Sequence, residues 1–216
     1  MKKKGAGVAI LFSGGADSTA TVLHYLRKKR PVALLTLYNG AESMMDMAKY
    51  RAGLLREKFG SLCTWEQRDV KDLFHRLAIQ TLEPDVKKYG TLVCCGCKLA
   101  MLAEAILFCR EHGIQELADG FRREQIYYPE QTAEYMVPTG RLAQSFGVRY
   151  VHPLYEKRDA TVHQMAADAG LPSVALQPSC LFAFNRIRPS VKIRKYVISK
   201  LPAVRAFLKQ RLRSFA

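Results

Sequence analysis

The sequence lacks any apolar segment long enough to cross a membrane. A membrane-spanning helix needs about 20 consecutive apolar residues, and no stretch of this chain approaches that length. The first apolar run, residues 7–12, follows three lysines and superficially suggests a signal peptide. It covers only about six residues and enters a glycine turn, so it predicts a buried strand instead. We therefore expect no membrane span and a cytoplasmic location.

Acidic residues are scarce and unevenly spread. The 216 residues include 34 Lys or Arg against 19 Asp or Glu, which gives a formal net charge of +15. No acidic residue follows Asp168, whereas ten lysines or arginines lie between Arg186 and Arg213. Such a basic segment predicts a polyanionic partner, with RNA favoured over an acidic membrane surface. The alternative is a solvated helical face without a partner.

Neither an internal repeat nor a low-complexity linker divides the sequence. Short apolar runs alternate with helical patterns, which predicts an α/β fold with a doubly wound, mainly parallel five-stranded sheet of the Rossmann-like type. We expect one nucleotide-binding and catalytic domain, residues 1–185, and a basic tail, residues 186–216, of two amphipathic helices broken at Pro202. The expected strands are residues 7–12, 31–37, 61–66, 114–118 and 149–151, and the expected core helices are residues 19–30, 42–59, 98–112, 139–146 and 158–169, with an interrupted helix from residue 69.

A glycine turn follows the first predicted strand. Residues 13–18 read SGGADS and open a helical pattern. Two adjacent glycines let the backbone approach a ligand closely, and the helix N-terminus adds free N–H groups and a positive dipole end. With the hydroxyls of Ser13 and Ser18, the turn suits a phosphate chain, while Asp17 could hold Mg²⁺ or cap the helix. The turn lacks the Gly-Lys-Ser/Thr ending of a Walker loop, so transfer of a γ-phosphate is the weaker inference.

The other candidate ligand contacts also follow predicted strands. In a doubly wound fold, ligands bind at the carboxyl ends of the strands. The glycine turn, Tyr38-Asn39, Asp119-Gly120 and the segment after the fifth strand should therefore face one crevice. The arginines that follow Gly120 could reach phosphates there, or could lie in a solvated loop.

Three of the six cysteines lie within four residues. Cys94 and Cys97 form a C-x-x-C pair directly before a predicted helix, with Cys95 between them. The spacing lets two thiolates share a metal ion or a cluster, and a helix N-terminus lowers the pKa of a thiol. A second C-x-x-C pair is missing, so structural zinc is the less attractive reading. The three cysteines could also form a tight redox turn, or could simply be small buried side chains.

Cys180 lies far from this pair in sequence but can return to the same crevice, since its loop follows the last core helix. Three cysteines from two loops would leave one iron of a 4Fe–4S cluster without a protein ligand. An open iron can bind hydrosulfide and deliver sulfur to an activated carbon. Alternatively, Cys97 could carry a persulfide and Cys180 could release the sulfur by forming a disulfide.

The order of these motifs resembles the PP-loop ATP pyrophosphatases, which adenylate a substrate and release pyrophosphate. The pattern is most similar to tRNA thiolation enzymes of the 2-thiouridine synthase type. The similar features are SGGADS at residues 13–18, the cysteine motif before a basic helix, the strand that ends at Ala118-Asp119-Gly120, the Cys-Leu-Phe at residues 180–182, and the stretch 153–172. Departures are Phe121 in place of the usual histidine, the extra Cys95, and the absence of the large RNA-binding domains of many tRNA thiolases.

The resemblance implies an ATP-dependent sulfurtransferase that uses ATP, Mg²⁺ and a 4Fe–4S cluster, with zinc less favoured. Its partners would be tRNA, bound through the basic tail, and a sulfur donor, either a persulfide protein or inorganic sulfide; a homodimer is also considered. The alternatives are a PP-loop enzyme that sulfurates or amidates a small molecule, and a nucleotide-binding RNA-associated module. The implied residues are Cys97, Cys180 and Asp17 for catalysis, Ser13, Gly14, Gly15, Asp17, Ser18, Tyr38, Gly120 and Lys157 for ATP, and Cys94, Cys97 and Cys180 for the cluster.

Overall fold

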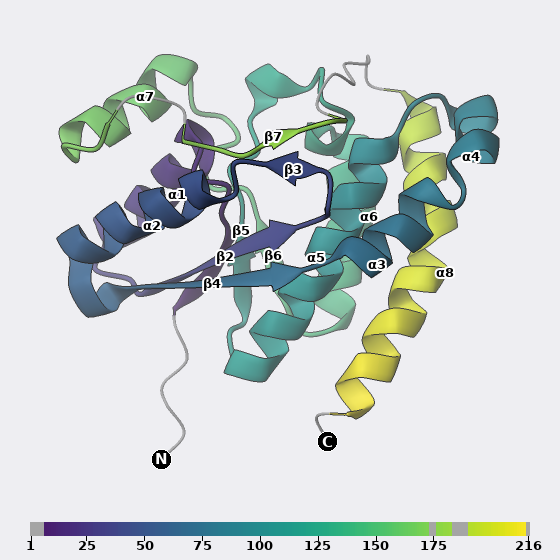
Figure 1. The fold of residues 1–216 in the computed structure, drawn as a ribbon, viewed down its shortest axis with the longest axis horizontal. Helices are drawn as coiled ribbons and strands as arrows, with labels where there is room; N and C mark the ends of the chain where they lie inside the picture. Colours follow the sequence, from purple (N-terminus) through teal and green to yellow (C-terminus); the bar gives the residue numbers. More distant parts are fainter. Residues whose placement is uncertain (1–6, 173–175, 183–189, 215–216) are drawn as a thin grey trace.

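A parallel five-stranded sheet forms the centre of the protein, which we describe from a computed structural model covering residues 7–172, 176–182 and 190–214. The strand order is β4-β2-β1-β5-β6, and all four strand pairs are parallel (Figure 1). The inner strands are apolar and buried, as a sheet covered on both faces requires. The predicted doubly wound fold is therefore confirmed. The strands are β1 (Val8–Leu11), β2 (Val32–Tyr38), β4 (Cys63–Asp69), β5 (Glu116–Ala118) and β6 (Arg149–Val151).

Helices cover both faces of this sheet (Figure 1). Alternate residues of β1 point to opposite faces, so Val8 and Ile10 join one apolar core while Ala9 joins the other. The first core is closed by α1 (Ala16–Leu26), α2 (Asp46–Phe59) and α7 (Asp159–Asp168). The second is closed by α3 (Lys71–Phe74), α5 (Val93–His112), α6 (Ala133–Ser145) and α8 (Val191–Arg213), with α4 (Leu82–Tyr89) packed on α8.

The helix that carries the C-x-x-C pair begins earlier than predicted. The sequence places the three cysteines in a loop and starts the helix at Lys98, whereas α5 already begins at Val93. Val93 and Cys95 are buried, so packing against the core extends the helix through the motif. The predicted end is confirmed, because Gly113 adopts a left-handed conformation (φ 66°) directly after the last turn.

The C-terminal helix is continuous, so the predicted break at Pro202 is wrong. Pro202 lies inside α8, a helix of 23 residues. Its apolar face packs against α5 and α6 on both sides of the proline, and this burial holds the helix together where one backbone hydrogen bond is lost. Residues 186–189 of the predicted tail lie outside the described residues. The buried residues of this face are Ile193, Tyr196, Val197, Val204 and Leu208.

Several other boundaries differ from the sequence prediction. The helix expected over residues 42–59 starts at Asp46, since Glu42–Ser43 form a short strand, β3, that pairs antiparallel with β7 (Ser179–Cys180). The helix expected from residue 69 becomes α3, a π-helical turn and α4, and the helix expected over 139–146 starts six residues earlier as α6. The short helical turns are η1 (Gly60–Leu62), η2 (His75–Ile79), η3 (Arg123–Gln125) and η4 (Pro129–Gln131).

Across the described ranges, no single helix is long and apolar enough to cross a membrane. The pair α4 and α5 meets the length and composition requirement only when joined, and the two helices are bent by 118° at their break.

Candidate active site

A cavity of about 700 Å³ opens at the carboxyl ends of the strands. It is lined by the glycine turn after β1, by the first turn of α5, by the β5–α6 loop and by the strand that carries Cys180. The parallel sheet explains this convergence, because consecutive strands end at the same edge. Of the predicted site residues, those that line the cavity are Ser13, Asp17, Ser18, Cys94, Cys97, Gly120 and Cys180. Gly14, Gly15, Tyr38 and Lys157 lie outside this lining.

Backbone from a distant segment passes directly over the glycine turn. Gly14 has a φ of +80°, and a Cβ there would lie 2.2 Å from the carbonyl oxygen of Leu176 and 2.9 Å from the Cα of Ala48. Both are backbone atoms, so only glycine permits this approach. A Cβ on Gly15 would lie 2.2 Å from Oε1 of Gln177, which is the end of a side chain that can rotate away.

Hydroxyl groups gather where the turn enters α1. The Oγ atoms of Ser13 and Ser18 are 3.2 Å apart, and the Gly15 N–H donates to Ser13 Oγ at 3.3 Å. The N-cap residue is Gly15, and no side chain caps the helix. The N-terminus of α1 thus keeps its positive dipole end for a ligand, a geometry suited to an anion.

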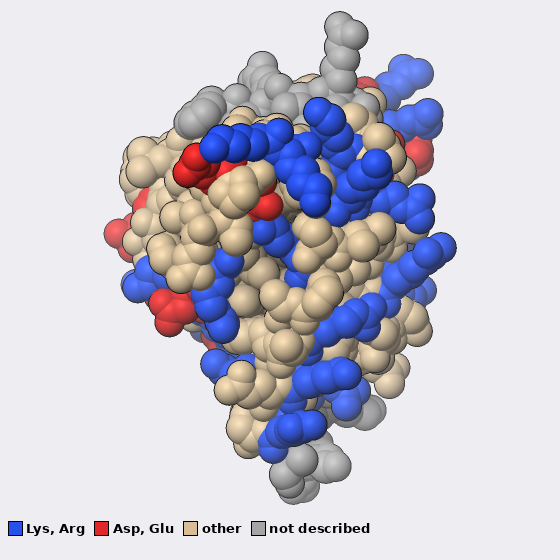
Figure 2. Space-filling view, turned by 90° about the vertical axis from the view of Figure 1, so that its right-hand side faces the viewer, with Lys and Arg blue, Asp and Glu red and all other residues tan. Residues whose placement is uncertain are grey.

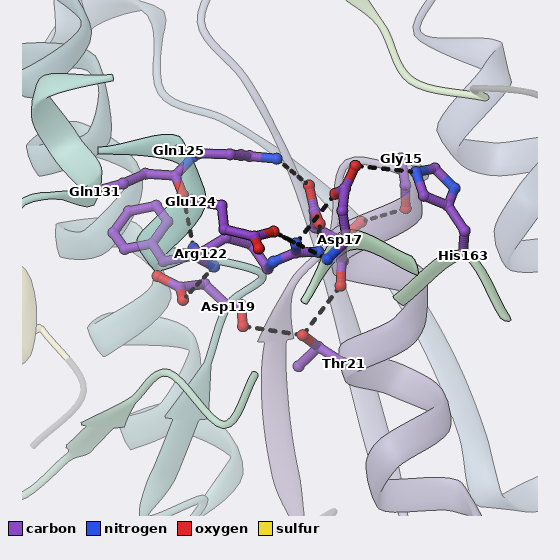
Figure 3. Close-up of polar contacts among 12 residues, drawn as sticks. Gly15, Asp17, Thr21, Asp119, Arg122, Glu124, Gln125, Gln131 and His163 are labelled. Atoms are coloured by element: carbon purple, nitrogen blue, oxygen red, sulfur yellow. Dashed lines mark hydrogen bonds and ion pairs between the residues drawn. The ribbon is translucent and has the colours of Figure 1, made fainter. Parts of the chain in front are cut away.

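Asp17 is held by a polar cluster rather than capping α1 (Figure 3). Its Oδ1 pairs with Arg122 at 2.9 Å, and its Oδ2 accepts a hydrogen bond from Gln125 at 3.0 Å. Arg122 is fully buried and also pairs with Glu124 and Asp159. The sequence left Arg122 open between a phosphate contact and a solvated loop, and the structure places its buried guanidinium in an ion cluster with three partly exposed carboxylates.

The end of β5 lies against the start of α1. A Cβ on Gly120 would lie only 2.7 Å from the carbonyl carbon of Asp17 and from the backbone nitrogen of Ser18. Beside it, the buried Asp119 accepts hydrogen bonds from Tyr150 Oη and from His152 Nδ1, the latter at 2.8 Å. Sequence analysis named Asp119 only as part of a turn, although a carboxylate at a strand's carboxyl end is a signal for a site residue.

The cysteines separate into two environments. Cys94 and Cys97 from the first turn of α5 and Cys180 from β7 all line the cavity, whereas Cys95 is fully buried away from it. The β3–β7 pairing sets Glu42 opposite Cys180 and so brings this distant cysteine to the cavity. Asn39 Nδ2 donates to Cys97 Sγ at 2.9 Å. The structure thereby distinguishes Cys94 from Cys95, which the sequence could not do.

Three thiols are available to hold a metal centre at the cavity. Within the described ranges, no three His, Cys, Asp or Glu side chains are close enough together to hold one ion. A structural zinc site requires such a closed set of ligands. The thiolates of a 4Fe–4S cluster bind different irons, and Cys94, Cys97 and Cys180 are the cysteines that line the cavity.

Cys97 does not show the lowered thiol pKa that the sequence predicts at a helix N-terminus. Burial raises the pKa of the Cys97 thiol to about 12, even though the Asn39 hydrogen bond and the nearby Lys98 lower it. Burial likewise raises the pKa of Cys63 and of Cys109 to about 12, and neither residue lines the cavity.

An ion cluster lies at the opposite edge of the sheet, at the amino ends of the strands. Glu116 is 5% exposed and accepts hydrogen bonds from Arg30 at 2.7 Å and from Tyr25 at 2.9 Å, and it also pairs with Arg149. Burial raises the pKa of this carboxyl, but the two donors and the two positive charges outweigh burial and lower it. These ion pairs lie away from the cavity, so we assign them to the stability of the fold rather than to the candidate site.

Comparisons with known proteins find relatives by structure only. No protein-family model matches the sequence, and a search of curated proteins finds no match. A 4-thiouridine synthetase solved with RNA and ATP is 19% identical with a TM-score of 0.68, over 94% of this chain and 53% of that chain. The chain thus spans about half the length of that enzyme.

Two further solved structures show the same likeness. The U34-tRNA thiolase NcsA from Methanococcus maripaludis, solved with its [4Fe-4S] cluster, is 17% identical with a TM-score of 0.59, covering 96% of this chain and 74% of that chain. An NMN synthetase from Francisella tularensis is 11% identical with a TM-score of 0.56, covering 96% and 85%. The chain therefore has the fold of the PP-loop ATP pyrophosphatases, the superfamily that its sequence resembles.

Proposed function

We propose that the protein is an ATP-dependent sulfurtransferase that replaces a carbonyl oxygen of a tRNA base with sulfur. One observation carries the proposal: the glycine turn and the three cysteines Cys94, Cys97 and Cys180 line a single cavity. A nucleotide-binding turn alone would serve any adenylating enzyme. Thiols in the same cavity add a place from which sulfur can reach the activated carbon.

The glycine turn would hold the phosphates of ATP. Ser13, Gly14, Gly15 and Ser18 would contact them through hydroxyls and backbone N–H groups, and Asp17 would hold Mg²⁺. Asp17 would then exchange its present contact with Arg122 for the metal ion. By resemblance, Gly120, Tyr38 and Lys157 would be further ATP contacts, although the last two require a rearrangement to reach the cavity.

The chemistry would proceed in two displacements. The carbonyl oxygen of the base attacks the α-phosphorus of ATP, the bond to the β-phosphate oxygen breaks, and pyrophosphate leaves. Sulfur then attacks the adenylated carbon, and AMP leaves with the original oxygen. The first step is needed because hydroxide is a poor leaving group, whereas AMP is a good one.

The cysteines would supply the sulfur. Cys94, Cys97 and Cys180 would hold a 4Fe–4S cluster, which when bound offers one iron without a protein ligand for a sulfide. In the alternative route, Cys97 carries a persulfide and its outer sulfur attacks the carbon. Cys180 then attacks the sulfur of Cys97, so that a disulfide forms and the sulfur stays on the base.

The exposed side of α8 would bind the RNA backbone. Lysines and arginines run along the face that contains α8 (Figure 2). Lys200 is the buried exception and pairs with Asp85 at 2.5 Å. We propose that the catalytic domain and this tail act together in the cytoplasm, where the six cysteines, none of them in a disulfide, stay reduced. The exposed or half-exposed cationic residues of α8 are Lys192, Arg194, Lys195, Arg205, Lys209, Arg211 and Arg213.

The sulfur donor would be a persulfide-carrying protein or inorganic sulfide. A homodimer is a further prediction, which sedimentation analysis can check.

The central test incubates anaerobically purified protein with ATP, sulfide and unmodified tRNA, and measures pyrophosphate and thiolated nucleosides by mass spectrometry. We expect both products with the wild type, and loss of the thionucleoside in Cys97→Ala and Cys180→Ala. Cys63→Ala, a packed cysteine away from the cavity, is the matched control. Absence of tRNA-dependent pyrophosphate from the wild type contradicts the proposal.

Two alternatives have distinct outcomes in the same assay. The likeness to an NMN synthetase favours an enzyme that amidates or sulfurates a small molecule, and such an enzyme would release pyrophosphate without tRNA. A nucleotide-binding RNA-associated module would bind tRNA without releasing pyrophosphate. A brown protein with iron–sulfur absorbance supports the cluster, and a colourless protein with one zinc supports a structural metal.

A further inference from the structure

One wall of the cavity is formed by the β5–α6 loop, residues 119–132, and the proposed function uses no residue of this loop beyond Gly120. Tyr127 and Tyr128 both line the cavity, with ring centroids 4.6 Å apart. Tyr127 is 40% exposed, so part of this aromatic pair is accessible from solvent. Aromatic side chains in this position are suited to stack on a planar heterocycle.

Glu130 lies in the same wall and has an unsatisfied carboxylate oxygen. The residue lines the cavity and is 8% exposed, and within the described ranges its buried Oε2 has no hydrogen-bond partner. Other buried carboxylates of the protein are paired: Glu116 with two arginines, Asp119 with Tyr150 and His152. A buried oxygen without a partner is costly unless a ligand supplies the donor.

The wall is fixed in place by a chain of hydrogen bonds. Gln131 accepts from the backbone N–H of Arg122 at 2.7 Å and donates to Gln125 at 2.9 Å, and Gln125 in turn donates to Asp17 at 3.0 Å (Figure 3). Thr132 Oγ1 closes the η4 turn by donating to the Pro129 carbonyl at 2.7 Å. The unpaired oxygen of the neighbouring residue is therefore not the result of a loosely held loop.

The position of the wall relates it to the sulfur chemistry. The η4 turn packs against α5. Burial raises the pKa of the Glu130 carboxyl, and the positive charge of Lys98, directly after the C-x-x-C pair, offsets part of that rise. At its other end, the loop contacts Asp17 of the glycine turn through Gln125. A base held on this wall would therefore lie between the nucleotide and the thiols.

We propose that residues 127–130 are the recognition wall for the base that is modified: Tyr127 and Tyr128 stack on an unpaired nucleobase of the RNA, and the Glu130 carboxyl accepts a hydrogen bond from an N–H on its edge. This inference rests on the proposed function and specifies its substrate as a base turned out of a helix or loop. An N–H next to a carbonyl is the edge that a thiolated base presents. Stacking tolerates any base, so the hydrogen bond supplies the selection.

The stacking role is tested by binding of an unmodified tRNA transcript and by kinetics of tRNA-dependent pyrophosphate release. Loss of one stacked base costs about 1–3 kcal/mol, so Tyr127→Leu and Tyr128→Leu should weaken tRNA binding by about 5- to 150-fold. Tyr127→Phe and Tyr128→Phe keep the ring and should bind nearly as wild type. Tyr50→Leu, at a 57% exposed tyrosine on α2, is the matched control.

The hydrogen bond is tested with Glu130→Gln against Glu134→Gln, a half-exposed glutamate on the next helix. We expect kcat/KM for tRNA to fall at least tenfold only in Glu130→Gln, with the melting temperature unchanged or raised because an unpaired buried charge is removed. ATP affinity should be unchanged in every variant. Binding of tRNA by the leucine variants as strong as in the control overturns the inference, and so does a loss of ATP affinity, which would make the tyrosines an adenine site.

These outcomes are separable from failure of the proposed function. If the wild type binds tRNA but releases no pyrophosphate, the sulfurtransferase proposal fails, and the binding comparison still decides whether the tyrosines contact RNA. If the wild type is active and the Glu130→Gln variant has wild-type kinetics, the base edge is read elsewhere and only the inference fails.

Discussion

Replacing Gly120 with alanine is expected to displace the nucleotide-binding turn. The new Cβ would lie 2.7 Å from two backbone atoms, the carbonyl carbon of Asp17 and the nitrogen of Ser18. Ordinary contact begins at 3.4 Å, so β5 and α1 must separate by about 0.7 Å. Backbone atoms of a strand and a helix cannot rotate away as a side chain can, which makes the strain unavoidable.

The magnitude follows from the cost of overpacking. Inserting a methyl group into a packed site costs about 1–3 kcal/mol, which for a chain of this size lowers the melting temperature by about 2–12 °C. Displacement of the turn should also weaken the chemistry, because a shift approaching 1 Å can cost about 100-fold in rate. We therefore expect Gly120→Ala to lose ATP affinity and pyrophosphate release by at least tenfold.

Gly140→Ala is the matched control. Gly140 lies inside α6, and a Cβ there would meet no atom within 4 Å. Removing a helix-interior glycine should stabilise the protein by about 0.5–1 kcal/mol and raise the melting temperature by about 1–4 °C. Urea unfolding, thermal melting and calorimetric ATP titration measure both variants. Equal effects of the two substitutions on stability and ATP affinity would refute the steric argument.

Three further predictions concern charge. Burial raises the pKa of Glu116, but its hydrogen-bond donors and positive neighbours lower it overall. The ionised carboxylate therefore stabilises the fold above the unfolded-state pKa, and this stabilisation is lost as the pH falls through the lower folded-state pKa. In urea unfolding, Glu116→Gln should flatten the drop in the free energy of unfolding below about pH 4.5. Arg122→Met, which removes a buried guanidinium from partly exposed carboxylates, should lower the free energy of unfolding in urea by about 1.5–3 kcal/mol, and Arg123→Met, at an exposed ion pair, by less than about 1 kcal/mol. The double substitution Arg194→Gln with Lys195→Gln on α8 should lower the salt slope of tRNA binding by about 0.7–0.9 per phosphate contact removed; an unchanged slope would rule out this face.

The structure changes how the tail should be tested. Deletion of residues 187–216 is the test that the sequence suggests, because the tail reads as an appendage. However, α8 buries apolar side chains such as Tyr196 and Val204 against α5 and α6, and its deletion would expose that core. The two helices α5 and α8 are in close contact at the cysteine motif, where a Cβ on Gly96 would lie 2.6 Å from Tyr196 Oη. Exposed charges are therefore the substitutions that separate RNA binding from folding.

Strand positions and the sheet were predictable because they depend on local pattern. Runs such as Val32–Tyr38 are apolar without interruption, and that pattern has few solutions other than a strand buried on both faces. The glycine turn was predictable for a similar reason, since adjacent glycines between a strand and a helix leave few conformations. Helix boundaries were less predictable: α5 begins five residues early because the residues of its first turn are buried by distant segments.

The sequence by itself determined the doubly wound sheet, the glycine turn at residues 13–18 and the basic character of the C-terminal region, since periodicity, glycine spacing and charge are local properties. Only the tertiary structure decided that Cys94 rather than Cys95 faces the cavity, that β3 and β7 bring Cys180 to it, and that Glu130 lies there with an unpaired oxygen. These depend on packing between segments far apart in the chain. A local pattern can show which face of a helix is apolar, but it does not record which distant segments will meet at a cavity.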